Sequence, residues 1–245
     1  AIPFPRAGVP GSSAPLSAAP AAGAPGLRAA APRGRLRESL RASVAEGMFA
    51  EVVAACTGGA VLMAWALSLG GGPMLIGFLG ALPFLAHLVQ LPAAWPTATF
   101  GARRTTLVAV ALSRQSYLLL VPLPFLPVSS ETKRAVLFAV AAIAGIGGVV
   151  GNNAWVAWMG DLVPAGLRGR YFGRRTAMCS LSGSVAALTA GFLLDRAGGA
   201  SGATLSALAA TACAAGAATV WLMSKMHEPL GVTREPLDLS HAVAP

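Results

Sequence analysis

Six long apolar stretches, separated by short polar connections, dominate this sequence of 245 residues. A helix needs about 20 apolar residues to cross the hydrocarbon core of a bilayer. The stretches each come close to that length and lie at residues 46–69, 73–95, 105–126, 135–159, 176–194 and 203–224. Since backbone groups inside a bilayer must form their hydrogen bonds within the protein, this pattern predicts an all-α integral membrane protein, folded as a six-helix bundle over residues 46–224.

The composition agrees with a membrane protein and argues against nucleic acid as a partner. Hydrophobic residues make up 55% of the chain and charged residues 11%, against about 25% charged in soluble domains. The net charge of +9 could attract nucleic acid, but the charge falls in connections between apolar stretches, and no stretch interleaves aromatic residues with Lys or Arg on a polar face. We therefore expect the lipid bilayer as the surrounding medium and no nucleic acid as a partner.

The sequence contains no constellation of residues that indicates an enzyme. Its three cysteines, Cys56, Cys179 and Cys213, lie far apart inside apolar stretches and lack the spacing of a metal site. We find neither a phosphate-binding loop nor the turn that carries a catalytic serine. The sequence therefore predicts no catalytic residue, no metal and no cofactor.

The segments that flank the apolar stretches have a different character. Residues 1–33 are rich in alanine and proline, a composition that predicts a disordered tail. Residues 34–45 place Leu36, Leu40 and Val44 four apart among arginines, which indicates a short amphipathic helix on the membrane surface. Residues 225–245 are polar and are predicted to form a cytoplasmic linker or tail.

The distribution of positive charge predicts the orientation of the chain. With the N-terminus inside, 14 of the 18 Lys and Arg residues lie on the inner side and three in outer connections. Cytoplasmic loops carry such an excess, so we predict a multi-pass protein of the cell membrane with both termini cytoplasmic. Trp155 is expected to anchor at the interface, and Arg174 and Arg175 are expected to remain solvated.

One charged residue, Arg114, lies inside a predicted span. It is nine residues into the third stretch, roughly 13 Å deep at about 1.5 Å per residue. A charge there costs at least about 2.5–3.5 kcal/mol unless it faces a cavity or a partner. Arg114, with Gln115 beside it, is therefore a candidate for solute binding or coupling. The alternative is a tie between helices, with Glu51 as the natural partner and Glu46 solvated nearer the surface.

Three polar residues in other spans lie at a similar predicted depth, namely His87, Asn152 and Asn153. His87 could relay protons or form a hydrogen bond within the packed helices. Adjacent residues point about 100° apart on a helix, so we expect one asparagine to face a cavity and the other a neighbouring helix. Gly147 and Gly151 have the G-x-x-x-G spacing that favours close helix packing.

Two basic connections resemble those of a known family. The chain reads DLVPAGLRGRYFGRR over 161–175, and ATFGARR over 98–104. Both resemble inner loops of the major facilitator superfamily, the first the loop between spans four and five, the second the signature after span two. The resemblance covers about residues 36–225, one six-helix half of a twelve-helix transporter. It implies a cytoplasmic gate in which Asp161 pairs with an arginine of the second loop. The gate candidates are Gly101, Arg103, Arg104, Asp161, Arg168, Gly169 and Arg170.

The resemblance implies secondary transport of a small-molecule solute by alternating access. One half provides only one wall of such a pathway, so a second six-helix half, or a second copy in a homodimer, is implied as a partner. The alternative is a non-transporting membrane scaffold or assembly protein, or a truncated transporter fragment. Ala98 and Thr99 stand where the family signature has its Asp-Arg pair, and this favours the alternative slightly.

Overall fold

A computed structural model describes residues 33–197 and 200–228. All regular structure in these residues is helical. The α-helices are α1 (Arg33–Thr57), α2 (Gly59–Ser68), α3 (Pro73–Ala86), α4 (Ala94–Phe100), α5 (Ala102–Gln115), α6 (Ser130–Leu162), α7 (Arg168–Arg196) and α8 (Gly202–Ser224). Four 3-10 turns connect them, namely η1 (His87–Gln90), η2 (Ser116–Leu120), η3 (Leu123–Phe125) and η4 (Ala165–Leu167).

Six helical regions of the described chain are long and apolar enough to cross a membrane. They are Gly34–Ser68, Pro73–Gln90, Ala102–Phe125, Ser130–Leu162, Ala165–Arg196 and Gly202–Ser224. The prediction of an all-α six-helix bundle is therefore confirmed, and the chain is a multi-pass membrane protein by the length and composition of its helices. The predicted tails at 1–32 and 229–245 lie outside the described residues.

The first spanning region begins earlier than the sequence pattern indicates. Residues 34–45, expected as a short amphipathic helix at the membrane surface that leads straight into the first span, are the first turns of α1. Ser39 and Ser43 in these turns are 2% and 0% exposed, because the neighbouring helices already pack against this part of α1. The apolar spacing of residues 34–45 therefore reflects contact with protein as well as position at a surface.

Three spanning regions contain breaks in the α-helix. The first breaks between α1 and α2, where Gly59 has a φ of +48°, a left-handed conformation that glycine adopts at little cost. In the second, Pro83 lies inside α3 and cannot donate a backbone hydrogen bond, and the helix changes to the 3-10 form at His87. The third changes to the 3-10 form at Ser116, directly after Arg114 and Gln115.

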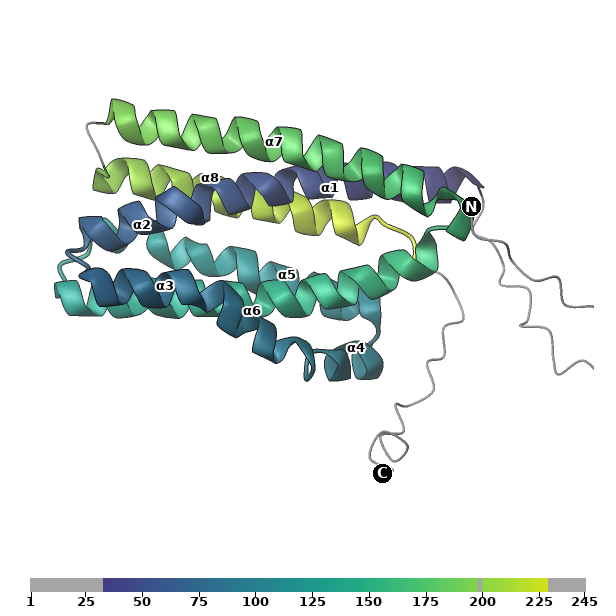
Figure 1. The fold of residues 1–245 in the computed structure, drawn as a ribbon, viewed down its shortest axis with the longest axis horizontal. Helices are drawn as coiled ribbons and strands as arrows, with labels where there is room; N and C mark the ends of the chain where they lie inside the picture. The colour runs from purple at the N-terminus through teal and green to yellow at the C-terminus, as the bar shows by residue number, and fades with distance from the viewer. Residues whose placement is uncertain (1–32, 198–199, 229–245) are drawn as a thin grey trace, which may run out of the picture. The chain divides into compact units, whose positions relative to one another are not determined.

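The helices pack as two groups that share α8 (Figure 1). In the first group α1 contacts α7 and α8, and in the second α5 contacts α6 and α8. Helices α1 and α7 run in the same direction, since Arg175 Nε donates to the Ser43 carbonyl at 3.3 Å and Ser182 Oγ donates to the Met48 carbonyl at 3.1 Å. The residue numbers increase together along both helices, which fixes their register.

Two apolar clusters fill the bundle. The larger contains residues of α1, α2, α3, α6, α7 and α8 and includes Trp65, Leu79, Leu137 and Leu205. The smaller consists of Val110, Trp155, Trp158, Met159, Leu162, Met223 and Met226. Charged residues of the bundle interior lie between these two clusters along α1, α5 and α7.

Candidate functional site

Three charged side chains from three helices meet inside the bundle. Glu46 of α1 is 2% exposed, and its Oε1 lies 3.8 Å from Nη2 of Arg114 on α5. Its Oε2 lies 3.1 Å from Nη2 of Arg175 on α7. One buried carboxylate therefore pairs with two arginines, and the pairing offsets the high cost of burying each charge alone. Glu46, Arg114 and Arg175 are called the charge cluster below.

Arg175 makes further contacts that hold it in place. Its guanidinium carbon lies 4.3 Å from the ring centroid of Trp155 on α6, in a cation–π arrangement. Gly47 on α1 permits the close approach, because a Cβ at that position would lie 2.7 Å from Arg175 Nη2 and 2.6 Å from Cys179 Sγ. Arg175 and Trp155 were expected at the water interface, and the structure instead places both in contact within the bundle.

Glu46 takes the position beside Arg114 that the sequence suggested for Glu51. Because α1 already begins at Arg33, Glu46 lies about 20 Å along the helix at about 1.5 Å per residue, well inside the bundle and not solvated. Glu51 lies against α7, where a Cβ on Gly183 would be 3.1 Å from Glu51 Oε2. The pairing that ties α5 to α1 is therefore Arg114 with Glu46.

Gln115 binds a different neighbour from Arg114. Its Nε2 donates to the Cys213 carbonyl of α8 at 3.2 Å. Gly216 allows α8 to approach at this point, because a Cβ there would lie 2.8 Å from Arg114 Cβ and 3.5 Å from Gln115 Nε2. Gln115 therefore joins α5 to α8 in the structure.

The bundle also contains a polar cavity, and none of the three charge-cluster residues lines it. Its volume is about 410 Å³, and it lies between the α1–α2 break, α3, η1, η2 and α6. The polar residues that line it are Thr57, His87, Gln90, Tyr117, Asn152 and Asn153. This set is called the polar cavity below. It brings together all three polar residues that the sequence placed at mid-depth in the second and fourth spans.

The hydrogen bonds of the polar cavity leave much of its lining available to a ligand. Gln90 Nε2 donates to Asn153 Oδ1 at 3.5 Å, and Asn153 Nδ2 donates to the Gln90 carbonyl at 3.2 Å. Asn153 therefore ties α6 to η1, as expected for one of the two asparagines. Asn152 and His87 line the cavity and are exposed. The polar side chains of the cavity can donate and accept hydrogen bonds, and none of those named is a carboxylate or a guanidinium; the rest of the lining is apolar.

The structure therefore separates the predicted solute and coupling residues, and Glu51 and Gln115 belong to neither the charge cluster nor the polar cavity. Arg114 belongs to the charge cluster, whereas His87, Asn152 and Asn153 belong to the polar cavity. Sequence analysis missed Tyr117, which lines the cavity one turn after Arg114. The spacing of three residues, which places both on one helical face, is the signal that could have identified it.

Two arginines of the predicted gate donate hydrogen bonds to carbonyls at the C-terminal ends of helices. Arg103 Nη2 donates to the Ser224 carbonyl, the last residue of α8, at 2.7 Å. Arg168 donates from Nη2 to the Gly160 carbonyl at 2.6 Å and from Nε to the Val163 carbonyl at 3.1 Å. Carbonyls at a helix C-terminus lack partners within the helix and carry partial negative charge. These arginines therefore stabilise the ends of α8 and α6.

The remaining gate candidates have varied surroundings. Gly101 joins α4 to α5 with a φ of +85°, in the left-handed region that favours glycine, which explains the glycine of this connection. Gly169 and Arg170 are exposed at the start of α7. Asp161 lies in the last turn of α6, and its pairing with Arg103 or Arg104 stays a prediction.

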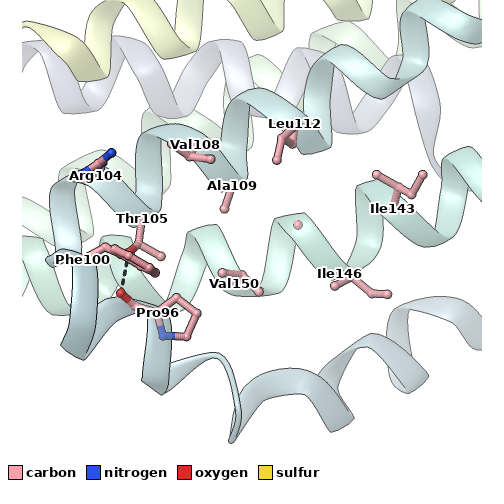
Figure 2. Close-up of a pocket in the computed structure, with 11 residues that line it drawn as sticks. Pro96, Phe100, Arg104, Thr105, Val108, Ala109, Leu112, Ile143, Ile146 and Val150 are labelled. Atoms are coloured by element: carbon pink, nitrogen blue, oxygen red, sulfur yellow. Dashed lines mark hydrogen bonds between the residues drawn. The ribbon is translucent and has the colours of Figure 1, made fainter.

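An apolar groove of about 560 Å³ runs between α5 and α6. Figure 2 shows Val108, Ile143 and Ile146 along it, with Arg104 at one end. The Thr105 hydroxyl near this end donates to the Pro96 carbonyl at 3.0 Å. Val108 and Ile143 are 53% and 50% exposed, as expected for side chains that face lipid tails, and the groove offers few groups for polar recognition.

Metal chemistry has no candidate position in the described part of the chain. No three His, Cys, Asp or Glu side chains there are grouped so that they could hold an ion.

Comparison with known proteins gives no relative for this chain. No family model matches it, and no curated protein or solved structure matches it significantly.

Proposed function

We propose that this chain is one six-helix half of a secondary transporter, as its basic connections suggest by their resemblance to the major facilitator superfamily. In this proposal a small solute binds in the polar cavity. A second half, either another copy of the chain or a separate chain, faces the cavity across the pathway. Both termini are cytoplasmic, and the protein lies in the cell membrane.

The observation that carries the proposal is the exposure of polar side chains on apolar helices. His87, Gln90 and Asn152 are all exposed, although they belong to regions apolar enough to span a membrane. A polar group that faces lipid tails loses its hydrogen bonds with water and gains none. This face is therefore expected to border water and a second bundle, which is the arrangement that alternating access requires.

The helix breaks support the same position for the site. Thr57 at the end of α1 and His87 at the end of α3 both line the polar cavity. Secondary transporters bind solutes at discontinuous helices near the membrane midplane. A cavity of about 410 Å³ is also within the range of small-molecule sites, about 300–1,000 Å³.

The lining favours a neutral polar solute. Amide, imidazole and hydroxyl groups line the cavity, and these groups recognise hydrogen-bonding solutes without a net charge. Arg114, the earlier candidate for an anionic group, is paired with Glu46. We therefore assign Arg114 a structural role and assign solute contact to Asn152 and His87.

Uptake into proteoliposomes tests the proposal. The full chain, alone and with any second half, is measured against a panel of neutral and charged solutes. Asn152→Ala is expected to lower uptake by up to about tenfold, the value of one hydrogen bond at about 0.5–1.5 kcal/mol. Thr211→Ala is the control, because the Thr211 hydroxyl donates only to the Ala207 carbonyl of its own helix. A folded wild type that moves no solute would favour the scaffold alternative.

Thiol labelling of intact cells tests the orientation. An impermeant reagent added outside is expected to label Gly71→Cys, in the connection between α2 and α3, and to leave Arg170→Cys unlabelled. The reverse pattern would exclude the proposed topology, and with it the direction of the solute pathway.

A further inference from the structure

A groove between α1 and α7 combines a basic end with an apolar floor. Its volume is about 500 Å³. Its cationic residues are Arg37, Arg41, Arg170 and Arg174, and its apolar residues include Leu40, Val44, Met48 and Met178. These eight residues define what we call the arginine groove. It shares no lining residue with the polar cavity.

The four arginines of the groove form no hydrogen bond or ion pair with the part of the chain that the structure describes. All four are exposed. The two other arginines of residues 161–175, in contrast, have partners within the protein. Arg168 donates to carbonyls of α6, and Arg175 pairs with Glu46. No carboxylate of the described chain lines the groove. Its positive charge is therefore not balanced by any residue that the structure describes in its lining.

Charge and apolarity are arranged in order along the groove. On α1, Arg37 and Arg41 come before Met48, and on α7, Arg170 and Arg174 come before Met178. Since α1 and α7 run in the same direction in a fixed register, both arginine pairs lie at one end of the groove. The methionines lie further along the spanning helices. The occupant that matches this order has an anionic head and an apolar tail.

We propose that the arginine groove binds an anionic phospholipid, with its phosphate among the arginines and an acyl chain along the apolar floor. Basic pockets between spanning helices bind such headgroups. Arginine suits this role because its planar guanidinium can bind phosphate oxygens in pairs. Lipid held there would stabilise the packing of α1 against α7, the two helices that carry Glu46 and Arg175.

Competition between two lipids tests this inference. The full chain in detergent receives equal amounts of phosphatidylglycerol and phosphatidylcholine with the same acyl chains, and native mass spectrometry measures which lipid is retained. The wild type is expected to prefer phosphatidylglycerol. Replacing both Arg41→Gln and Arg174→Gln is expected to reduce that preference about 30-fold, at roughly fivefold per arginine.

A charge-matched control separates the groove from the general positive charge of the protein. Arg35→Gln with Arg104→Gln removes two exposed arginines that do not line the groove, and this variant is expected to keep the wild-type preference. An equal loss in the control, or equal retention of both lipids by the wild type, would overturn the proposal. So would displacement of the lipid by glycerol phosphate at matched concentration, since the site would then recognise a soluble phosphate. Thermal unfolding of each variant confirms that its fold is intact.

Discussion

The charge cluster and the polar cavity lie in the same apolar bundle but differ in how far their polar groups are buried and paired. In the charge cluster, Glu46 is buried and pairs with arginines of two other helices. In the polar cavity, Asn152 and His87 remain exposed. The difference indicates that the paired charges fix the positions of helices, while the exposed neutral groups are those to which we assign solute contact in the proposed function.

The largest effect is expected from removing the shared carboxylate. Glu46→Gln leaves Arg114 and Arg175, both half-buried, without the buried carboxylate that pairs with them, and this should lower the free energy of unfolding by about 3–5 kcal/mol. Reversible unfolding in mixed micelles measures the loss. The control is Glu38→Gln, an exposed acid at the start of α1. If both variants unfold alike, the charge cluster does not hold the helices together.

Replacing a glycine by alanine should affect stability differently in the two regions. Gly47→Ala in the charge cluster would place a Cβ 2.6 Å from Cys179 Sγ, and such overpacking costs about 1–3 kcal/mol. Gly148→Ala in the cavity wall would place a Cβ 3.8 Å from Ser113 Oγ, an ordinary contact. We expect the first variant to unfold more easily and the second to keep its stability. Equal unfolding of the two variants would contradict the contrast.

A smaller effect is expected between Trp155 and Arg175. A double-mutant cycle with Trp155→Leu and Arg175→Gln isolates their cation–π interaction from the cost of each single change. The expected coupling energy is about 0.5–2 kcal/mol, again measured by unfolding in mixed micelles. A coupling energy near zero would show that the ring only fills space beside the guanidinium.

The smallest effect on stability is expected in the polar cavity. His87→Ala and Asn152→Ala remove exposed side chains, and such changes usually alter stability by less than about 0.5 kcal/mol. Both variants should nevertheless lower solute uptake in proteoliposomes, by up to about tenfold each. A variant of this pair that unfolds as easily as Glu46→Gln would place its residue among the structural groups.

The sequence predicted the spans because apolar length is a local property. It also identified Arg114, since a charge stands out in an apolar stretch. The partner of Arg114 could not be predicted, because it depends on where α1 begins. Glu46 seemed too close to the surface for a helix starting at 46, but α1 begins at Arg33.

The polar cavity was partly accessible from the sequence. Counting residues along each span placed His87 and Asn152 at similar depth, and the structure brings them to one cavity. Pro83 marks the kink of the second span in the sequence, but the other helix break that shapes the cavity was harder to predict. The α1–α2 break depends on the backbone conformation of Gly59, and Tyr117 was inconspicuous as one aromatic residue in an apolar stretch.

The position of Glu46 between two arginines also has a mechanical consequence. In the proposed transporter, rocking of the bundle would carry α1, α5 and α7 together as a rigid frame, because separating them would leave the buried Glu46 carboxylate without its arginine partners. The α3 side is joined to α6 at Asn153 by neutral amide bonds, which water can replace at little cost. In that proposal, the movement that opens or closes the pathway is expected in η1 and the end of α3, with α1, α5 and α7 as the fixed support.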